Sequence, residues 1–330
     1  MSLLSTFADF LKPARHADQA LLEALDLVAR MVEPALRFTP GFEKRLSGPL
    51  QHALGYCAGL VAALPGPIDI SRQAFANDPL VHALFATAAD IEQMLGRSQA
   101  VRDFLASPDC WENDYFYAML AARRQQKKQL GMEQQGELVR YDVPQVVLYF
   151  SGQTLVEPSC QIEHSRLGLR RKALESLLHT FRAHVEVLRH EREGLRADLS
   201  VERAHLTVLR SGAADAPAIA VGTRHLAELD LRLRQQAAAL EPEHLIVALA
   251  DYLATPEMAL QLCPVAITVD RLGIIRDQPD RDSNVHTLNF PELTARDRRL
   301  HLATLARINR DEALEAVEKV RDQQHRFMLI

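Results

Sequence analysis

The chain has 330 residues, of which 48% are hydrophobic and 25% charged; this excludes a disordered protein and allows one large domain or two to three ordinary ones. Its formal net charge of −5 gives no overall attraction to nucleic acid or to an anionic membrane surface. The abundance of Ala, Leu and Arg is typical of bacterial proteins, and we expect a bacterial origin.

Neither export nor membrane insertion is expected. The first 19 residues have no basic region before their short apolar stretch, which Asp9 interrupts. The nearest approach to a membrane span, 50–64, contains Gln51 and His52 and is too short. The cysteines are scattered without a C-x-x-C pair, which favours thiols in a reducing compartment: Cys57, Cys110, Cys160 and Cys263. We therefore predict a cytoplasmic protein without a membrane span.

The first 132 residues are predicted to form a helical domain. Apolar residues recur every three to four positions, which favours helices over 42–64, 77–98, 99–106 and 114–130. The second of these helices opens with a capping residue followed by Pro79 at the first helical turn, and it closes on Gly96.

A change of periodicity over 133–160 predicts the first part of a β-domain. The segment "GELVRYDVPQVVLYFSGQTLVEP" is rich in Val, Tyr, Phe and Thr, and Pro144 and Ser151-Gly152 interrupt it at hairpin spacing. We expect three antiparallel strands near 136–141, 145–150 and 153–157.

A long helical arm is predicted over 161–257. Eleven positions from Leu174 to Leu209 step by four and three residues without a break, which is the a/d register of a coiled coil. The segment 211–222 provides a turn, the leucines from Leu226 to Leu240 repeat the heptad on the way back, and a further helix follows from Glu241-Pro242. Nine of the eleven outgoing positions are apolar and form the predicted interaction stripe: Leu174, Leu178, Phe181, Val185, Leu188, Leu195, Leu199, Leu206 and Leu209.

The remainder, 258–330, is predicted to complete the β-domain and to end in a helix. The stretches "PVAITVDRLGIIRD" and "NVHTLNF" flank a polar loop, and "RRLHLATLARI" alternates apolar with polar residues. Asn309 and Glu312 resemble a capping box. The expected fold class is α+β and mostly helical: an N-terminal helical region beside a small antiparallel sheet, which a long antiparallel coiled-coil arm interrupts.

The lengths of the two arm helices predict an interaction. The outgoing stripe rises roughly 54 Å, whereas the return from Arg224 to Leu240 covers only about 25 Å. The base of the stripe, from Leu174 to Val185, therefore needs other cover, from the N-terminal helices, the β-domain or a second copy of the chain. We expect a homodimer, or another protein as the partner.

Two weaker patterns concern other ligands. The run "RRQQKK" is expected to be a solvated helix face, and contact of its cations with nucleic-acid phosphate is the alternative: Arg123, Arg124, Lys127 and Lys128. Asp280, Asp282 and Asn284 have the alternating spacing of a calcium loop, but Val285 stands where that loop requires glycine. We expect a hairpin loop there, with no metal and no cofactor.

The sequence has no catalytic motif of the common kinds: no G-x-S-x-G, no P-loop and no G-x-G-x-x-G. We therefore expect a non-enzymatic scaffold or assembly protein that uses the arm for self-association or for binding a partner. A nucleic-acid-associated factor, and an enzyme whose site comes from residues distant in sequence, stay open as alternatives.

Overall fold

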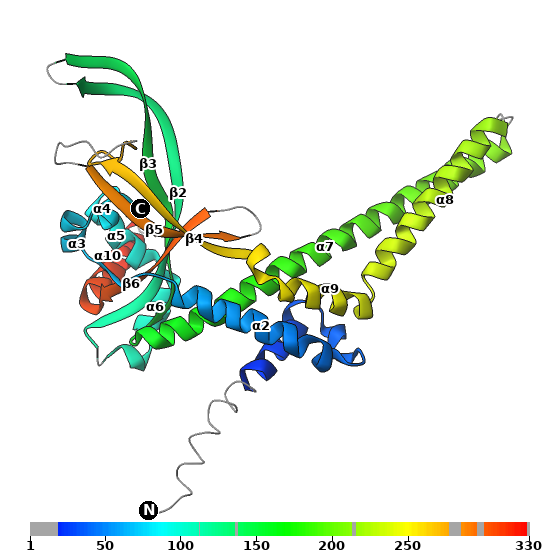
Figure 1. The fold of residues 1–330 in the computed structure, drawn as a ribbon, viewed down its shortest axis with the longest axis horizontal. Coiled ribbons are helices and arrows are strands. Elements are labelled where there is room, and N and C mark those ends of the chain that lie inside the picture. The colour runs from blue at the N-terminus through cyan, green and yellow to red at the C-terminus, as the bar shows by residue number, and fades with distance from the viewer. Residues whose placement is uncertain are drawn as a thin grey trace, which may run out of the picture. The chain divides into compact units, whose positions relative to one another are not determined.

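The computed structural model describes residues 19–111, 113–135, 138–212, 216–276, 285–295 and 300–328 (Figure 1). It mixes helices, 62% of the residues, with an antiparallel sheet, 27%, which confirms the expected combination of helices and antiparallel strands. The chain divides into two compact units. Unit 1 comprises Met1–Tyr56 and Leu174–Pro256, and unit 2 comprises Cys57–Ala173 and Glu257–Ile330.

Unit 2 contains one sheet of six strands. The strand order is β3-β2-β6-β5-β4, with β1 paired in parallel to β6 and the other pairs antiparallel. The strands are β1 (Ile68–Ile70), β2 (Tyr115–Gln135), β3 (Leu138–Ser159), β4 (Leu260–Asp270), β5 (Val285–Ala295) and β6 (Leu300–Asn309).

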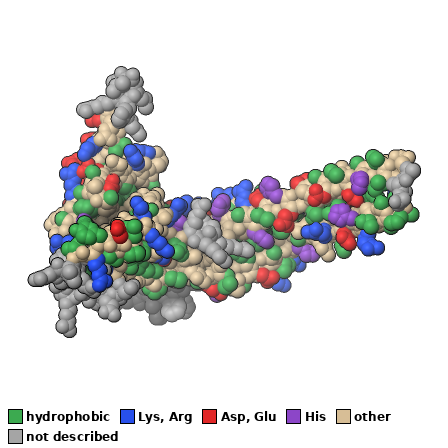
Figure 2. Space-filling view, turned by 90° about the horizontal axis from the view of Figure 1, so that it is seen from above, with side chains coloured by type: hydrophobic (Ala, Val, Ile, Leu, Met, Phe, Trp, Pro, Cys, Tyr) green, Lys and Arg blue, Asp and Glu red, His purple; other side chains and the backbone are tan. Residues whose placement is uncertain are grey.

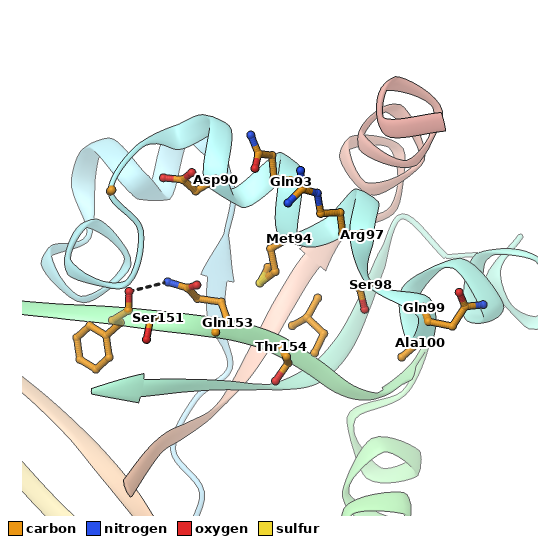
Figure 3. A pocket seen from close by; sticks show the side chains of 14 residues that line it. Asp90, Gln93, Met94, Arg97, Ser98, Gln99, Ala100, Ser151, Gln153 and Thr154 are labelled. Carbon is orange, nitrogen blue, oxygen red and sulfur yellow. Dashed lines mark hydrogen bonds between the residues drawn. The ribbon is translucent and has the colours of Figure 1, made fainter. Parts of the chain in front are cut away.

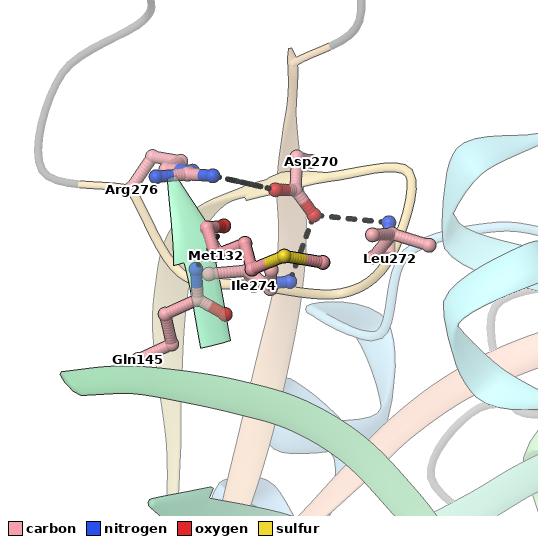
Figure 4. A network of polar contacts seen from close by, with 6 residues as sticks. All are labelled: Met132, Gln145, Asp270, Leu272, Ile274 and Arg276. Carbon is pink, nitrogen blue, oxygen red and sulfur yellow. Dashed lines mark hydrogen bonds and ion pairs between the residues drawn. The ribbon is translucent and has the colours of Figure 1, made fainter. Parts of the chain in front are cut away.

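The two outer strands of this order, β3 and β4, are joined by the short segment 273–276. The amide of Leu148 donates to Gly273 O and that of Ile275 to Val146 O, while Arg276 N donates to Thr268 O on β4. The Asp270 carboxylate holds the turn, because it accepts bonds from the amides of Leu272 and Ile274 and from the Arg276 guanidinium (Figure 4). The strands β3, β2, β6, β5 and β4, together with the segment 273–276, therefore form a closed ring of hydrogen-bonded neighbours.

Helices of unit 2 cover both faces of the sheet. One face shares a buried cluster with α4 (Pro79–Leu84), α5 (Ala88–Arg97), α6 (Gln99–Leu105) and α10 (Arg310–Met328). The other face is covered by the end of α2 (Phe42–Ala62) and the beginning of α7 (Ile162–Ser211), through Val61, Leu64 and Leu169. Short helices also form at α3 (Arg72–Asn77) and η2 (Pro108–Cys110), and η3 (Pro256–Met258) precedes β4.

Local capping explains where several of these helices begin. Asp78 Oδ1 accepts bonds from the amides of Leu80 and Val81 at the start of α4, and Asn309 Oδ1 caps α10 through the amides of Asp311 and Glu312. The single helix expected over 77–98 is wrong. It is divided into α4 and α5 because a second cap, Thr87 with Asp90, starts α5.

The helix expected over 114–130 is also wrong, since these residues form most of β2. Alternate residues from Phe116 to Ala122 are fully buried, which is the period of two of a strand with one buried face. The Ala, Leu, Gln, Lys and Arg content favours a helix locally, but pairing with β3 and β6 overrides this preference.

The three strands expected near 136–141, 145–150 and 153–157 are, from Leu138 onwards, one continuous strand, β3. Pro144 pairs in register with Leu130 and Gly152 lies at a register shift, so neither forms a hairpin turn. Gly152 has a φ of 64°, and Asp142 and Glu157 have φ values of 57° and 53°, so the strand absorbs these residues by local left-handed backbone.

Unit 1 is built from helices. A helix over 19–31 and η1 (Pro34–Phe38) precede α2, and the rest of α7 continues into α8 (Ala216–Ala239) and α9 (Pro242–Ala254). Because α8 begins at Ala216, the return helix has 24 residues and is longer than the sequence indicated. It runs antiparallel beside the second half of α7. A Cβ on Gly222 would lie 2.7 Å from Leu206 Cδ2, and Gln236 Nε2 donates to Glu191 Oε2 at 3.2 Å.

Candidate interaction surface

The apolar stripe predicted along α7 is covered within the chain. Six of its nine side chains are buried: Leu174, Leu178, Phe181, Val185, Leu199 and Leu206. The other three, Leu188, Leu195 and Leu209, are half-buried. Towards the end of α7 this cover comes from α8, whose Leu229 and Gly222 are buried as well.

The base of the stripe, expected to need cover beyond the return helix, is covered by other helices of the same chain. The rings of Phe181 and Tyr252 lie 5.4 Å apart, and the Tyr252 hydroxyl donates to Leu177 O at 3.1 Å, so α9 packs against this part of α7. Arg189 forms ion pairs with Glu33, just before η1, and with Glu186. Helices of unit 1 therefore cover the first turns, and an uncovered base no longer argues for a dimer.

A different face of α7 is open. Each residue of this face comes two positions after a residue of the a/d register. It therefore lies about 200° around the helix axis from that register. All eight side chains are exposed, and Val187, Val201 and Val208 are 52%, 68% and 67% exposed. We call this set the open face: Val187, His190, Gly194, Ala197, Val201, Ala204, Val208 and Ser211.

The open face carries none of the charged residues that are frequent on the rest of this segment. Nine Asp, Glu or Arg residues lie between 187 and 211, and all are at other positions. Figure 2 shows charged and histidine side chains interspersed with hydrophobic ones along this part of the molecule. A solvated helix face is normally the charged one, whereas the centre of a protein interface is depleted in charge. The distribution of charge therefore favours a contact surface.

Gly194 is a second anomaly of the open face. It lies inside a 50-residue helix, where glycine costs about 1 kcal/mol relative to alanine. A Cβ at this position would meet no atom within 4 Å, so packing within the chain does not require glycine. Glycine does allow a backbone of another segment to approach closely.

Comparisons with known proteins identify no relative. No family model, no curated protein sequence and no solved structure matches this chain.

Sequence reasoning selected the buried stripe and missed the open face. The overlooked pattern is a seven-residue repeat: 187–189, 194–196, 201–203 and 208–210 read VLR, GLR, VER and VLR. Its first position lies on the open face, and its third forms a column of arginines. Two of these, Arg189 and Arg196, form ion pairs with the glutamates three residues before them.

The basic residues of "RRQQKK" do not converge on one surface. They lie on β2, not on a helix, and side chains alternate along a strand. Arg123 and Lys127 therefore point to one side, and Arg124 and Lys128 to the other. Arg124 is also engaged in unit 2, since its Nη2 lies 3.2 Å from Oε2 of the buried Glu292. This arrangement gives the nucleic-acid alternative no continuous basic patch at these residues.

The calcium-loop pattern of Asp280, Asp282 and Asn284 lies outside the described residues. Within the described ranges, no three His, Cys, Asp or Glu side chains are grouped as metal ligands would be. Over the same ranges, no helix is both long enough and apolar enough to cross a bilayer.

Unit 2 contains two cavities with the volume of a small-ligand site. One, of about 700 Å³, lies between α5 and β3, and Asp90, Gln93, Arg97 and Gln153 contribute to its lining (Figure 3). The other, of about 810 Å³, is lined by residues of α4, β3 and the turn after β4 and includes Asp270.

Polar groups of both cavities already serve the fold. Asp90 caps α5 through Thr87, and Gln153 Nε2 donates to Leu84 O at 2.6 Å. In the larger cavity, Asp270 accepts the bonds that hold its own turn. Neither cavity indicates a reaction class, and the open face of α7 is the better supported candidate.

Proposed function

We propose that the chain is a non-enzymatic assembly protein and that α7 and α8 form an antiparallel coiled coil that binds a further helix. The C-terminal half of the buried stripe joins α7 to α8, and the open face receives the partner, which is a second copy of the chain or another protein. The observation that carries the proposal is the uncharged, exposed open face on a segment that is otherwise rich in charge.

The dimensions of the open face suit a helical partner. Its eight positions span 25 residues, about 36 Å along the helix, and they repeat with the period of a coiled-coil seam. Small side chains at Gly194, Ala197 and Ala204 allow a short distance between helix axes, and the three valines supply apolar contact area.

The test places charge on the open face. Val201→Glu with Val208→Glu adds two carboxylates to its C-terminal half, where burial against a partner would be costly. We expect at least a tenfold loss of self-association, measured by light scattering at micromolar concentration, or of the partner recovered from native lysate by the wild-type chain.

The matched control is Ser200→Glu with Thr207→Glu. These residues are exposed, lie on the same helical turns and gain the same charge, but they are outside the open face. The control variant should bind like the wild type. A wild-type chain that is monomeric and recovers no partner, or equal losses in the two variants, would overturn the proposal.

A further inference from the structure

The larger cavity of unit 2, of about 810 Å³, has an apolar floor and an apolar rim. Its floor includes four residues of the buried core of the unit: Phe85, Leu148, Phe150 and Val269. Two other lining residues, Tyr149 and Leu272, are 44% and 78% exposed although their side chains are large and hydrophobic. A cavity of this size with a mostly apolar lining is the usual form of a small-molecule site, and the apolar part of a ligand would cover these exposed side chains.

The two carboxylates of this cavity are already engaged in the fold. Asp78 Oδ1 accepts bonds from the amides of Leu80 and Val81 at the start of α4, where negative charge is favourable. Asp270 accepts bonds from the amides of its own turn and from the Arg276 guanidinium (Figure 4). Both carboxylates therefore have partners within the chain, and a cationic ligand is not favoured.

The cation of the lining is Arg271, which forms no ion pair with any residue that the structure describes. It is exposed and lies on the turn that follows β4, beside Leu272. The histidines of the lining, His82 and His286, are neutral or positively charged, so they do not repel an anion. A guanidinium without a carboxylate partner binds a carboxylate through charge-assisted hydrogen bonds. The charges of the lining therefore favour an anionic group at the rim.

We propose that this cavity binds a small amphipathic anion, a molecule with a carboxylate head and an apolar chain or ring. The carboxylate pairs with the Arg271 guanidinium at the rim. The apolar part lies over Tyr149 and Leu272 and against the core residues of the floor, where burial removes its surface from water. The site belongs to unit 2, so unit 2 binds this ligand whether or not the open face of α7 binds a helix.

The experiment compares three probes that share one apolar chain and differ in the charge of the head. The full chain is titrated with octanoate, octan-1-ol and octylamine, and binding is measured by displacement of anilinonaphthalene sulfonate, a fluorescent amphipathic anion. We expect octanoate to bind at least fivefold more tightly than either of the others. Octanoate should also slow amide hydrogen exchange of the wild-type chain over 76–86, 147–150 and 269–273, the segments that line the cavity.

Two arginine variants separate this cavity from the other one. Arg271→Gln should weaken octanoate binding at least fivefold and leave the binding of octan-1-ol unchanged. The matched control is Arg97→Gln, because Arg97 is also exposed and loses the same charge but lines the other cavity of unit 2. This control should bind octanoate like the wild type.

The proposal is overturned if the wild-type chain binds the three probes equally, or if the two arginine variants lose the same affinity. Slower exchange only outside the three lining segments would have the same meaning. The exchange measurement on the wild-type chain decides the matter if a variant fails to fold.

Discussion

The two units each contain an extended pair of segments, and the two pairs are held together by different forces. In unit 2, β2 continues to pair with β3 as far as Gln135, well past Arg123, its last residue paired with β6. In unit 1, α8 packs along α7 through a few buried side chains, among them Leu199, Leu206 and Leu229. We call the β2–β3 hairpin the ribbon and α7 with α8 the helix pair. Main-chain hydrogen bonds hold the ribbon together, and side-chain contacts hold the helix pair together.

This difference predicts a different response to substitution. Main-chain bonds between strands form with almost any side chain, so the ribbon tolerates changes on its exposed faces. Each helix of the other pair satisfies its own backbone, so side-chain contacts, chiefly apolar burial, keep the two together. Substitutions at the α7–α8 contact should therefore have the larger effects.

The largest effect is expected from Leu206→Ala. Leu206 is 4% exposed and lies against Gly222, so truncation leaves a cavity and should cost about 3 kcal/mol. Amide hydrogen exchange over 195–211 and 216–233 should accelerate about a hundredfold. Leu209→Ala, at a half-buried position, should accelerate it less, and equal protection in both variants would contradict a helix pair held by side chains.

A smaller effect is expected in the ribbon from Gly131→Ala. The Gln145 side chain crosses the space that a Cβ on Gly131 would occupy, and its Nε2 donates to Met132 O at 3.0 Å. Displacing this amide should cost about 1–2 kcal/mol, measured by chemical denaturation. Combining the change with Gln145→Ala removes the clash, so the two costs should be less than additive. Full additivity would show that the two residues do not interact.

The smallest effect, and the only gain, is expected from Gly194→Ala. Since no atom lies within 4 Å of the added methyl group, the helix propensity of alanine should stabilise α7 by about 1 kcal/mol. Slower hydrogen exchange around residue 194 is the measurement. Destabilisation of the isolated chain would mean that this backbone is already packed against a neighbour.

Sequence reasoning succeeded where structure is determined locally. The start of α4 follows from Asp78 and Pro79, that of α10 from Asn309, and α7 from its unbroken heptads, because caps and periodicity act within a few residues. The class of helices with antiparallel strands could be predicted for the same reason.

Sequence reasoning failed where pairing with residues distant in sequence determines the structure. Residues 115–130 have the composition of a helix and become a strand because β3 pairs with most of them and β6, nearly 200 residues later, pairs with residues 115–123. The seven-residue repeat of the open face is present in the sequence. Only the structure shows that this face is exposed, whereas α8 covers part of the stripe.

The VLR, GLR, VER and VLR repeat of α7 has a consequence for the precision of docking. A helix that slides along this surface by one heptad, about 10 Å, meets nearly the same side chains again. Several registers of the two helices, each one heptad apart, would then be close in energy. Gly194 is the exception in this repeat. Because it has no side chain, it leaves space for a bulky residue of the incoming helix and so favours one register.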